Sequence, residues 1–248
     1  MAGRCAACGL AAGPYAAFGG DALRHDCLVA GGGCGAWARR RSGGSLSRGY
    51  CPPLLATCLF AMHRRPLLEM LDRYAQRYPA ERAVAARIRL LVAGHADCFE
   101  RSCRPGHITA SAWVTTPACD RFLLVHHRKL GRWLQPGGHA DGQTDVAAVA
   151  LREAIEESGI AGLRHARKRP TPLDLDVHVI PARYDAAGRL IEDEHEHHDV
   201  RFLVWADGDA VPRTSDESHD VRWFTADELP AINDEESLLR LWRKASNR

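Results

Sequence analysis

Apolar residues recur at three- and four-residue steps over two early segments of the chain, and this spacing predicts helices. The first series is broken at Pro79, and the second begins at Ala80. The apolar positions that carry the two series are Leu67, Leu68, Leu71, Tyr74 and Ala75, then Val84, Ile88, Leu91 and Val92. We expect residues 62–105 to form a helical hairpin or lid.

From Ile108 onward the apolar residues alternate with polar ones or form short continuous runs, which is typical of β-strands. The expected strands cover residues 108–116, 122–127, 133–135, 173–180, 197–205 and 221–224. Turns are expected at 117–120, 129–132 and 184–188, a capped helical turn at 225–229, and a closing helix at 235–244. This order predicts an α/β fold with a mixed sheet and helices on both sides.

A third helical segment carries Glu153, Glu156 and Glu157 at positions i, i+3 and i+4, within about 100° of its circumference. Like charges at this spacing destabilise a helix by roughly a few tenths of a kcal/mol per pair. A sequence that clusters them therefore usually has a positively charged group or ion to bind. Carboxylate oxygens suit Mg²⁺ or Mn²⁺ better than zinc. The pattern therefore favours a divalent-cation site over a solvated acidic helix.

Signals for both ends of this helix are present. Thr144 or Asp145 can cap its start, and Gly159 can take the left-handed conformation that ends it. Val146 and Val149 lie nearer the acidic side. The apolar residues opposite the glutamates, which we expect to pack against the core, are Ala148, Leu151 and Ile155.

The segment from Gly138 to Ile160 resembles the signature of the Nudix hydrolase family. That signature reads glycine, five residues, glutamate, seven residues, then R-E-U-x-E-E-x-G-U, where U is aliphatic. With Arg152 in the arginine position, Gly138 is the first glycine and Gly159 the late one. The three glutamates occupy the acidic positions, and the long fixed spacing makes the match specific.

One position departs from the signature, because Thr144 stands where the family has its first glutamate. In the family that glutamate mainly supports the arginine. We therefore expect Asp141 or Asp145 to pair with Arg152 instead, and the metal-binding carboxylates to remain complete.

The resemblance covers roughly residues 106–245 and implies the Nudix α/β/α sandwich, with 106–248 as the hydrolase domain. It implies a pyrophosphohydrolase that cleaves a diphosphate linkage in a nucleoside diphosphate derivative or a related X-diphosphate. Mg²⁺ or Mn²⁺ would be held by Glu153, Glu156, Glu157 and the carbonyl of Gly138. Glu153 would act as the base, and Arg152 would orient the glutamates.

Polar residues around the acidic helix supply further candidates. His195, His197 and Asp199 alternate in a predicted strand, so they share one face and can meet a metal or a phosphate. An acid from outside the signature commonly completes the family's site, and Glu194, Glu196, Asp199 and Glu217 are the candidates. Candidates for substrate binding are Arg132, Trp133, His139, His195, His197, Asp199 and Glu217.

Two other functions remain open. One is a non-catalytic Nudix domain that binds a nucleotide or regulates a partner, although such a module has no need of three clustered carboxylates. The other is an isomerase acting on a diphosphate-bearing substrate, because a fold alone does not fix the reaction.

The first 61 residues differ in composition from the rest. They hold 12 of the 22 glycines and six of the nine cysteines, with almost no branched aliphatic residues. Such a segment buries too little apolar surface to order itself, so we expect it to be disordered or not part of the native protein. A zinc module built on Cys5, Cys8, Cys27 and Cys34 is the alternative, but the last two are spaced too widely for a standard motif.

The odd number of cysteines favours a reducing, cytoplasmic location, with Cys98, Cys103 and Cys119 as ordinary thiols. No apolar run approaches the roughly 20 residues that span a bilayer. The formal net charge of +2 argues neither for nor against nucleic acid. The resemblance implies a small-molecule diphosphate as the partner, and we expect neither a membrane nor nucleic acid as a partner.

Overall fold

The computed structural model describes residues 38–40, 46–48, 62–216, 218–233 and 235–247. Contacts divide the chain into two units, Met1–Leu54 and Leu55–Arg248. In the first unit, strands β1 (Ala38–Arg40) and β2 (Leu46–Arg48) form an antiparallel pair. The rest of residues 1–61, and with it the question of disorder or a cysteine-bound zinc, lies outside the described residues.

A mixed sheet forms the centre of the second unit, as expected. Its main path runs in the order β12-β4-β3-β11-β7. β3 (Gly106–Thr115) pairs in parallel with β11 (His195–Trp205) and in antiparallel with β4 (Arg121–His127). β12 (Ser218–Thr225) continues the sheet beyond β4. The sequence predicted all four of these strands to within a few residues.

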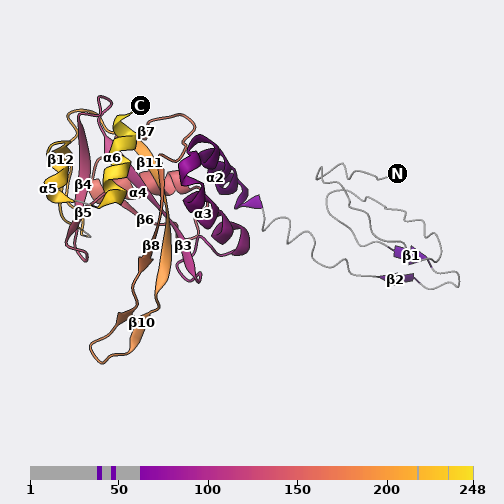
Figure 1. The fold of residues 1–248 in the computed structure, drawn as a ribbon. Helices are drawn as coiled ribbons and strands as arrows, with labels where there is room; N and C mark the ends of the chain where they lie inside the picture. The colour runs from indigo at the N-terminus through magenta and orange to yellow at the C-terminus, as the bar shows by residue number, and fades with distance from the viewer. Residues whose placement is uncertain (1–37, 41–45, 49–61, 217, 234, 248) are drawn as a thin grey trace. The chain divides into compact units, whose positions relative to one another are not determined.

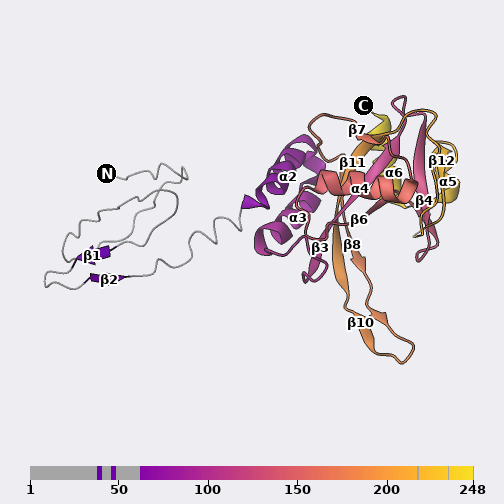
Figure 2. The same ribbon diagram turned by 180° about the vertical axis from the view of Figure 1, so that it is seen from behind.

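Shorter strands extend this sheet. β5 (Arg132–Leu134) pairs with β4, β6 (Gly137–His139) with β3, and both β7 (Arg164–His165) and β8 (Asp174–Ile180) with β11. β9 (Arg183–Tyr184) and β10 (Leu190–Glu192) form the end of a long arm that projects from the β8–β11 pair (Figures 1 and 2). β6, β7, β9 and β10 were not predicted, because strands of two or three residues are too short to show a clear apolar period.

The predicted N-terminal hairpin is confirmed. α2 (Arg65–Arg77) and α3 (Arg82–Gly94) lie side by side, and the 3₁₀ turn η1 (Pro79–Glu81) joins them at the predicted proline break. The other helices are α4 (Val146–Ser158), α5 (Leu229–Ile232) and α6 (Glu236–Ser246). Among the described residues, no helix combines the length and apolar composition needed to cross a membrane.

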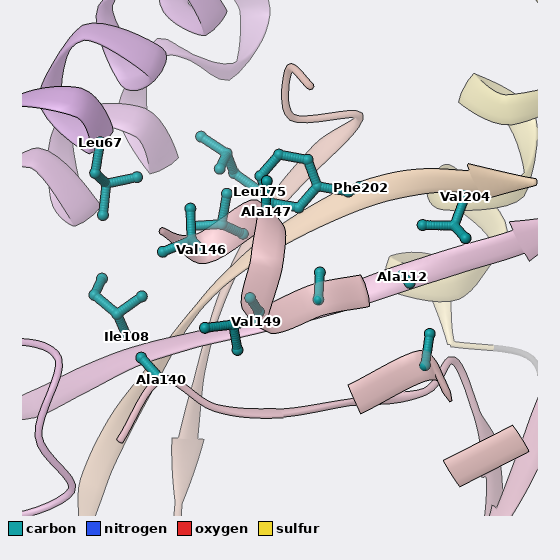
Figure 3. Close-up of a cluster of buried hydrophobic side chains, with 14 of the residues drawn as sticks. Leu67, Ile108, Ala112, Ala140, Val146, Ala147, Val149, Leu175, Phe202 and Val204 are labelled. Atoms are coloured by element: carbon teal, nitrogen blue, oxygen red, sulfur yellow. The ribbon is translucent and has the colours of Figure 1, made fainter. Parts of the chain in front are cut away.

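Two apolar layers make the unit an α/β/α sandwich. On one face of the sheet, Ile108 from β3 and Phe202 from β11 pack with residues of α2, α3 and α4 (Figure 3). On the other face, Trp113 and Leu203 pack with α5 and α6. The side chains of each strand alternate between the layers, as the pleat requires. The helical hairpin therefore shares one core with the sheet.

The ends of α4 were predicted correctly, but its buried face was not. Asp145 caps the helix, since its side chain accepts a hydrogen bond from the Ala148 amide at 3.1 Å, and Gly159 ends it with a φ of 65°. The expected stripe of Ala148, Leu151 and Ile155 is only half-buried. The fully buried apolar residues are Val146, Ala147, Val149, Ala150 and Ala154. The acidic side of α4 is turned toward the sheet.

A buried ion network ties β8, β11 and α6 together. Arg201, whose side chain is 4% exposed, contacts Asp199 at 2.9 Å, Asp174 at 3.3 Å and Asp176 at 3.1 Å. Asp174 is fully buried and also contacts Arg240 at 2.8 Å. Burial alone raises the pKa of Asp176, but the hydrogen bond with His178 and the charges of Arg201 and Arg240 hold it well below its usual value.

The network makes stability sensitive to acid. An aspartate whose pKa is lower in the folded protein than its unfolded value of about 3.9 stabilises the fold. This stabilisation is fully present when the pH is above the unfolded pKa, and it is lost as the pH falls through the folded pKa. We expect the free energy of unfolding to drop as pH falls from about 5 toward 2. Asp176→Asn should flatten this slope in denaturant titrations, whereas Asp207→Asn, at an exposed pair with Arg164, should not. Equal slopes in wild type and Asp176→Asn would contradict the prediction.

Candidate active site

Two of the three signature glutamates lie against the backbone of β6. The carboxylate of Glu157, a buried residue, accepts a hydrogen bond from the Gly137 amide at 3.0 Å. The side chain of Glu153 is 13% exposed and lies directly over Gly138. The third carboxylate, that of Glu156, is 57% exposed. The glycine turn and the acidic helix are therefore in contact, as the resemblance implied.

Gly138 is required here by close approach and not by its backbone angles. A Cβ at this position would lie 2.4 Å from the Cδ and Oε2 atoms of Glu153. The space that a larger residue would fill is taken by the carboxylate itself.

Replacing Gly138 with alanine is expected to displace the Glu153 carboxylate. Because the displaced group is the end of a flexible side chain, the melting temperature should change little. Any metal-dependent activity should fall by about 10- to 100-fold, as when groups that orient metal ligands are altered. Thermal melts and kcat measurements on the two proteins check this. Gly94→Ala, which meets no atom within 4 Å, is the control, and unchanged activity in Gly138→Ala would count against the assignment.

Arg152 bridges the glutamates. One guanidinium nitrogen lies 2.8 Å from Glu153 and 3.1 Å from Glu156, and the other donates to the His139 carbonyl at 3.2 Å. The guanidinium is thus held between the helix and β6.

The expected substitute partners for Arg152 were wrong. The carboxylate of Asp141 contacts Arg101 at 2.8 Å, and the hydrogen bond from Arg101 holds the Asp141 pKa below its usual value. Asp145 is used as the helix cap. Arg152 is instead supported by Glu153, Glu156 and a carbonyl, so Thr144 does not leave the guanidinium without acceptors.

His195 and His197 lie on one face of β11, as predicted, and the structure adds two histidines to them. The ring of His107 in β3 is 5.0 Å from that of His195 and 4.9 Å from that of His197. The ring of His139 in β6 is 4.9 Å from that of His197. His107 was missed because the predicted strand began one residue after it. The polar alternation through Thr109 is the signal that extends the strand back to this histidine.

Burial lowers the pKa values of His107, His139 and His197. It lowers the pKa of His107 to about 4, helped by the charges of His139 and His195. Burial also lowers the pKa of His139 to about 4, with Arg101 acting in the same direction. The pKa of His197 is lowered further, first by burial and then by His139 and His107.

Asp199 does not join the histidines at an open face. Its buried carboxylate accepts hydrogen bonds from Thr109 at 3.2 Å and Ser111 at 2.7 Å, and it pairs with Arg201. These contacts account for the Asp199 carboxylate without a ligand, and its role in binding substrate or metal stays a prediction.

The remaining substrate-binding candidates have other partners or lie outside the described residues. Arg132 pairs with Glu235. Trp133 meets Phe224 edge-on, with ring centroids 4.8 Å apart, and Arg222 stacks over its ring. Both side chains therefore have partners that explain them without a substrate. Glu217 lies outside the described residues.

Of the acids proposed to complete the site, Glu196 is engaged with Arg87 and lies 3.0 Å from His198. Glu194 is exposed and lies between the end of β10 and the start of β11. The arrangement does not select either as a further ligand.

Comparison with known proteins connects this geometry to a family. A sequence profile of the NUDIX domain matches residues 105–242, which is more than half of the chain. No curated protein matches the sequence.

Solved structures give weaker likenesses. The chain is similar to an Ap4A hydrolase of C. elegans, with 21% identity over 56% of this chain and 95% of that one and a TM-score of 0.40. It is similar to a MutT NUDIX hydrolase of Burkholderia pseudomallei, with 24% identity, coverages of 54% and 94% and a TM-score of 0.39. It is also similar to the NUDIX domain of Shewanella oneidensis NrtR complexed with ADP ribose, with 19% identity over 57% of this chain and 86% of that one and a TM-score of 0.40.

The profile match spans the glycine turn, Arg152 and the three glutamates of α4, and the fold around them is the α/β/α sandwich that the resemblance implied. The chain belongs to the Nudix family.

Proposed function

We propose that this protein is a metal-dependent hydrolase that cleaves a diphosphate linkage in a nucleoside diphosphate derivative or a related X-diphosphate. The observation that carries the proposal is the position of Glu153 and Glu157 against Gly137 and Gly138 of β6. A solvated acidic helix turns its glutamates to water, whereas this one turns two of them toward the protein.

The donor atoms fit Mg²⁺ or Mn²⁺. Glu153, Glu156 and Glu157 offer only carboxylate oxygens, and the Gly138 carbonyl is a further oxygen donor in the same region. Hard cations of this kind are bound through oxygen. When bound, the cation lowers the pKa of a coordinated water and offsets the charge that builds on the leaving phosphate.

Residues of the protein accept the proton and position the carboxylates. Glu153, held by Arg152 and by contact with Gly138, takes the proton from the attacking water. Arg152 is a positioning residue, because its guanidinium fixes Glu153 and Glu156 relative to the His139 carbonyl. The amide of Gly137 fixes Glu157 in the same way.

A substrate panel tests the proposal. Nucleotide sugars, dinucleoside polyphosphates, NADH, coenzyme A, oxidised dNTPs and diphosphoinositol-type compounds should be incubated with the protein and Mg²⁺ or Mn²⁺. Release of phosphate or a nucleoside monophosphate, abolished by EDTA and restored by the metal, is the expected result. Saturable binding without turnover would support a binding or regulatory domain, and a product of unchanged mass would indicate an isomerase.

A further inference from the structure

Five of the thirteen histidines gather on one face of the sheet. His107 is the direct cross-strand neighbour of His197 in the parallel β3–β11 pair, and His197 is the neighbour of His178 in the β11–β8 pair. His139 lies opposite Thr109, two residues along β3 from His107. His195 precedes His197 by two residues. The pleat therefore points all five side chains to the same side.

Three of these rings form a compact triangle. The ring centroids of His107, His139 and His197 are separated by 5.1, 4.9 and 4.9 Å. One nitrogen from each ring lies within 4.8 Å of those from the other two. Zinc binds histidine nitrogen at about 2.0–2.1 Å, so modest ring rotations bring three nitrogens onto one ion.

His107 provides an independent indication of a ligand. The residue is 2% exposed, yet neither of its ring nitrogens has a hydrogen-bond partner within the described part of the structure. Buried polar groups in proteins are nearly always paired, because an unpaired one has lost its water without compensation. An ion bound among the three rings satisfies one of these nitrogens.

We propose that His107, His139 and His197 bind one divalent transition-metal ion of the zinc class. Imidazole nitrogen suits zinc and its neighbours in the first transition row, whereas Mg²⁺ and Ca²⁺ require oxygen.

His195 is the nearest candidate for a fourth ligand. Its Nδ1 lies 2.8 Å from the Asp193 carbonyl, and its Nε2 lies 3.9 Å from a carboxylate oxygen of Glu192, beyond hydrogen-bond distance. A carbonyl or carboxylate on the distal nitrogen is the usual outer-shell arrangement of metal-binding histidines. His178 has a similar contact, with Nδ1 3.2 Å from Asp176.

This site is separate from the carboxylates of α4. The Cβ direction of Gly138 points at Glu153, and the next residue of β6, His139, points its ring to the opposite face. The inference therefore goes beyond the proposed hydrolysis and does not depend on it. Zinc binding and diphosphate cleavage are measured separately, so either can fail alone.

Titration of the chelator-treated full chain with Zn²⁺ and with Co²⁺ tests the site. We expect one tight equivalent, distinct from any weaker binding at the carboxylates of α4. In His139→Gln and His197→Gln the affinity of this tight equivalent should fall at least about 100-fold, because even outer-shell changes typically cost 10- to 100-fold. Both residues are only half-buried, so these variants spare the buried His107. His126→Gln and Glu156→Gln should bind as the wild type does. Unchanged affinity in both histidine variants, or a loss confined to Glu156→Gln, would overturn the proposal.

X-ray absorption at the zinc edge adds a test that needs no variant. With one equivalent of zinc on the wild-type chain, the spectrum should show several imidazole ligands. A sulfur-dominated spectrum would place the ion on cysteines, six of which lie in the first 61 residues. A spectrum of oxygen ligands would place it on the glutamates. Either result would refute the three-histidine site.

Discussion

Replacing Arg201 with methionine is expected to lower the free energy of unfolding by about 3–5 kcal/mol, the usual cost of removing one partner from a buried ion pair. Arg201 is the residue that contacts all three aspartates, Asp174, Asp176 and Asp199. Without it, Asp199 keeps only the hydroxyl groups of Thr109 and Ser111 as partners among the contacts described above. Asp174 keeps Arg240 and Lys244, so Asp199 is the carboxylate most affected.

Denaturant titration of wild type and Arg201→Met measures this loss. Arg243→Met is the matched control, because Arg243 pairs with Glu236 on the surface of α6. Exposed pairs contribute about 0–1 kcal/mol, so the control should stay near the wild type.

A second change separates the buried charge from simple loss of packing. Adding Asp199→Asn to Arg201→Met should restore part of the lost stability, because it removes the carboxylate that was left uncompensated. Equal losses in Arg201→Met and Arg243→Met would contradict the network. A double variant no more stable than Arg201→Met would show that the charge on Asp199 is not the cause.

The parts of the site that the sequence predicted are local in the chain. The glutamates, Arg152 and Gly138 lie within about twenty residues, and the helix caps were visible beside them. A pattern of apolar residues also finds long strands such as β3 and β11, because each repeats its period several times. Local spacing therefore sufficed for α4, its ends and its contact with the glycine turn.

What the sequence could not supply depends on register between distant strands. His107 and His197 are ninety positions apart, and only the parallel pairing of β3 with β11 places them side by side. The burial of α4 was mistaken for a related reason. The spacing of the apolar residues predicted that Leu151 and Ile155 would form the buried face of α4. The glycines of β6 instead allow the glutamate side of the helix to approach the sheet.

Asp199 shows that a correct pattern can leave the partners of a side chain unseen. It does share a face with His195 and His197, as alternation predicted. Arg201 follows it by two residues on that same face, and this was the available sign that the carboxylate has a partner. The partners from β3 and β8 become visible only in the folded sheet.

Replacing Glu157 with glutamine is expected to reduce metal-dependent turnover by at least about 100-fold, because changes to groups that only orient metal ligands already cost 10- to 100-fold. The change is nearly isosteric, and the amide oxygen of glutamine can still accept the hydrogen bond from Gly137. The fold should therefore survive while one negative charge is lost at the cation site. Glu156→Gln should have a similar effect on turnover with even less structural cost, since that side chain is 57% exposed.

The measurements are kcat and the concentration of Mn²⁺ that gives half-maximal activity, together with a thermal melt for each variant. Glu69→Gln is the matched control, because Glu69 is a surface glutamate of α2 that pairs with Arg65. It should leave both kinetic quantities unchanged. Loss of turnover with an unchanged melting temperature, accompanied by a higher Mn²⁺ requirement, would assign these carboxylates to the cation and not to the fold. Undiminished turnover in both Glu156→Gln and Glu157→Gln would refute the assignment of α4 as the metal-binding helix, whatever the substrate proves to be.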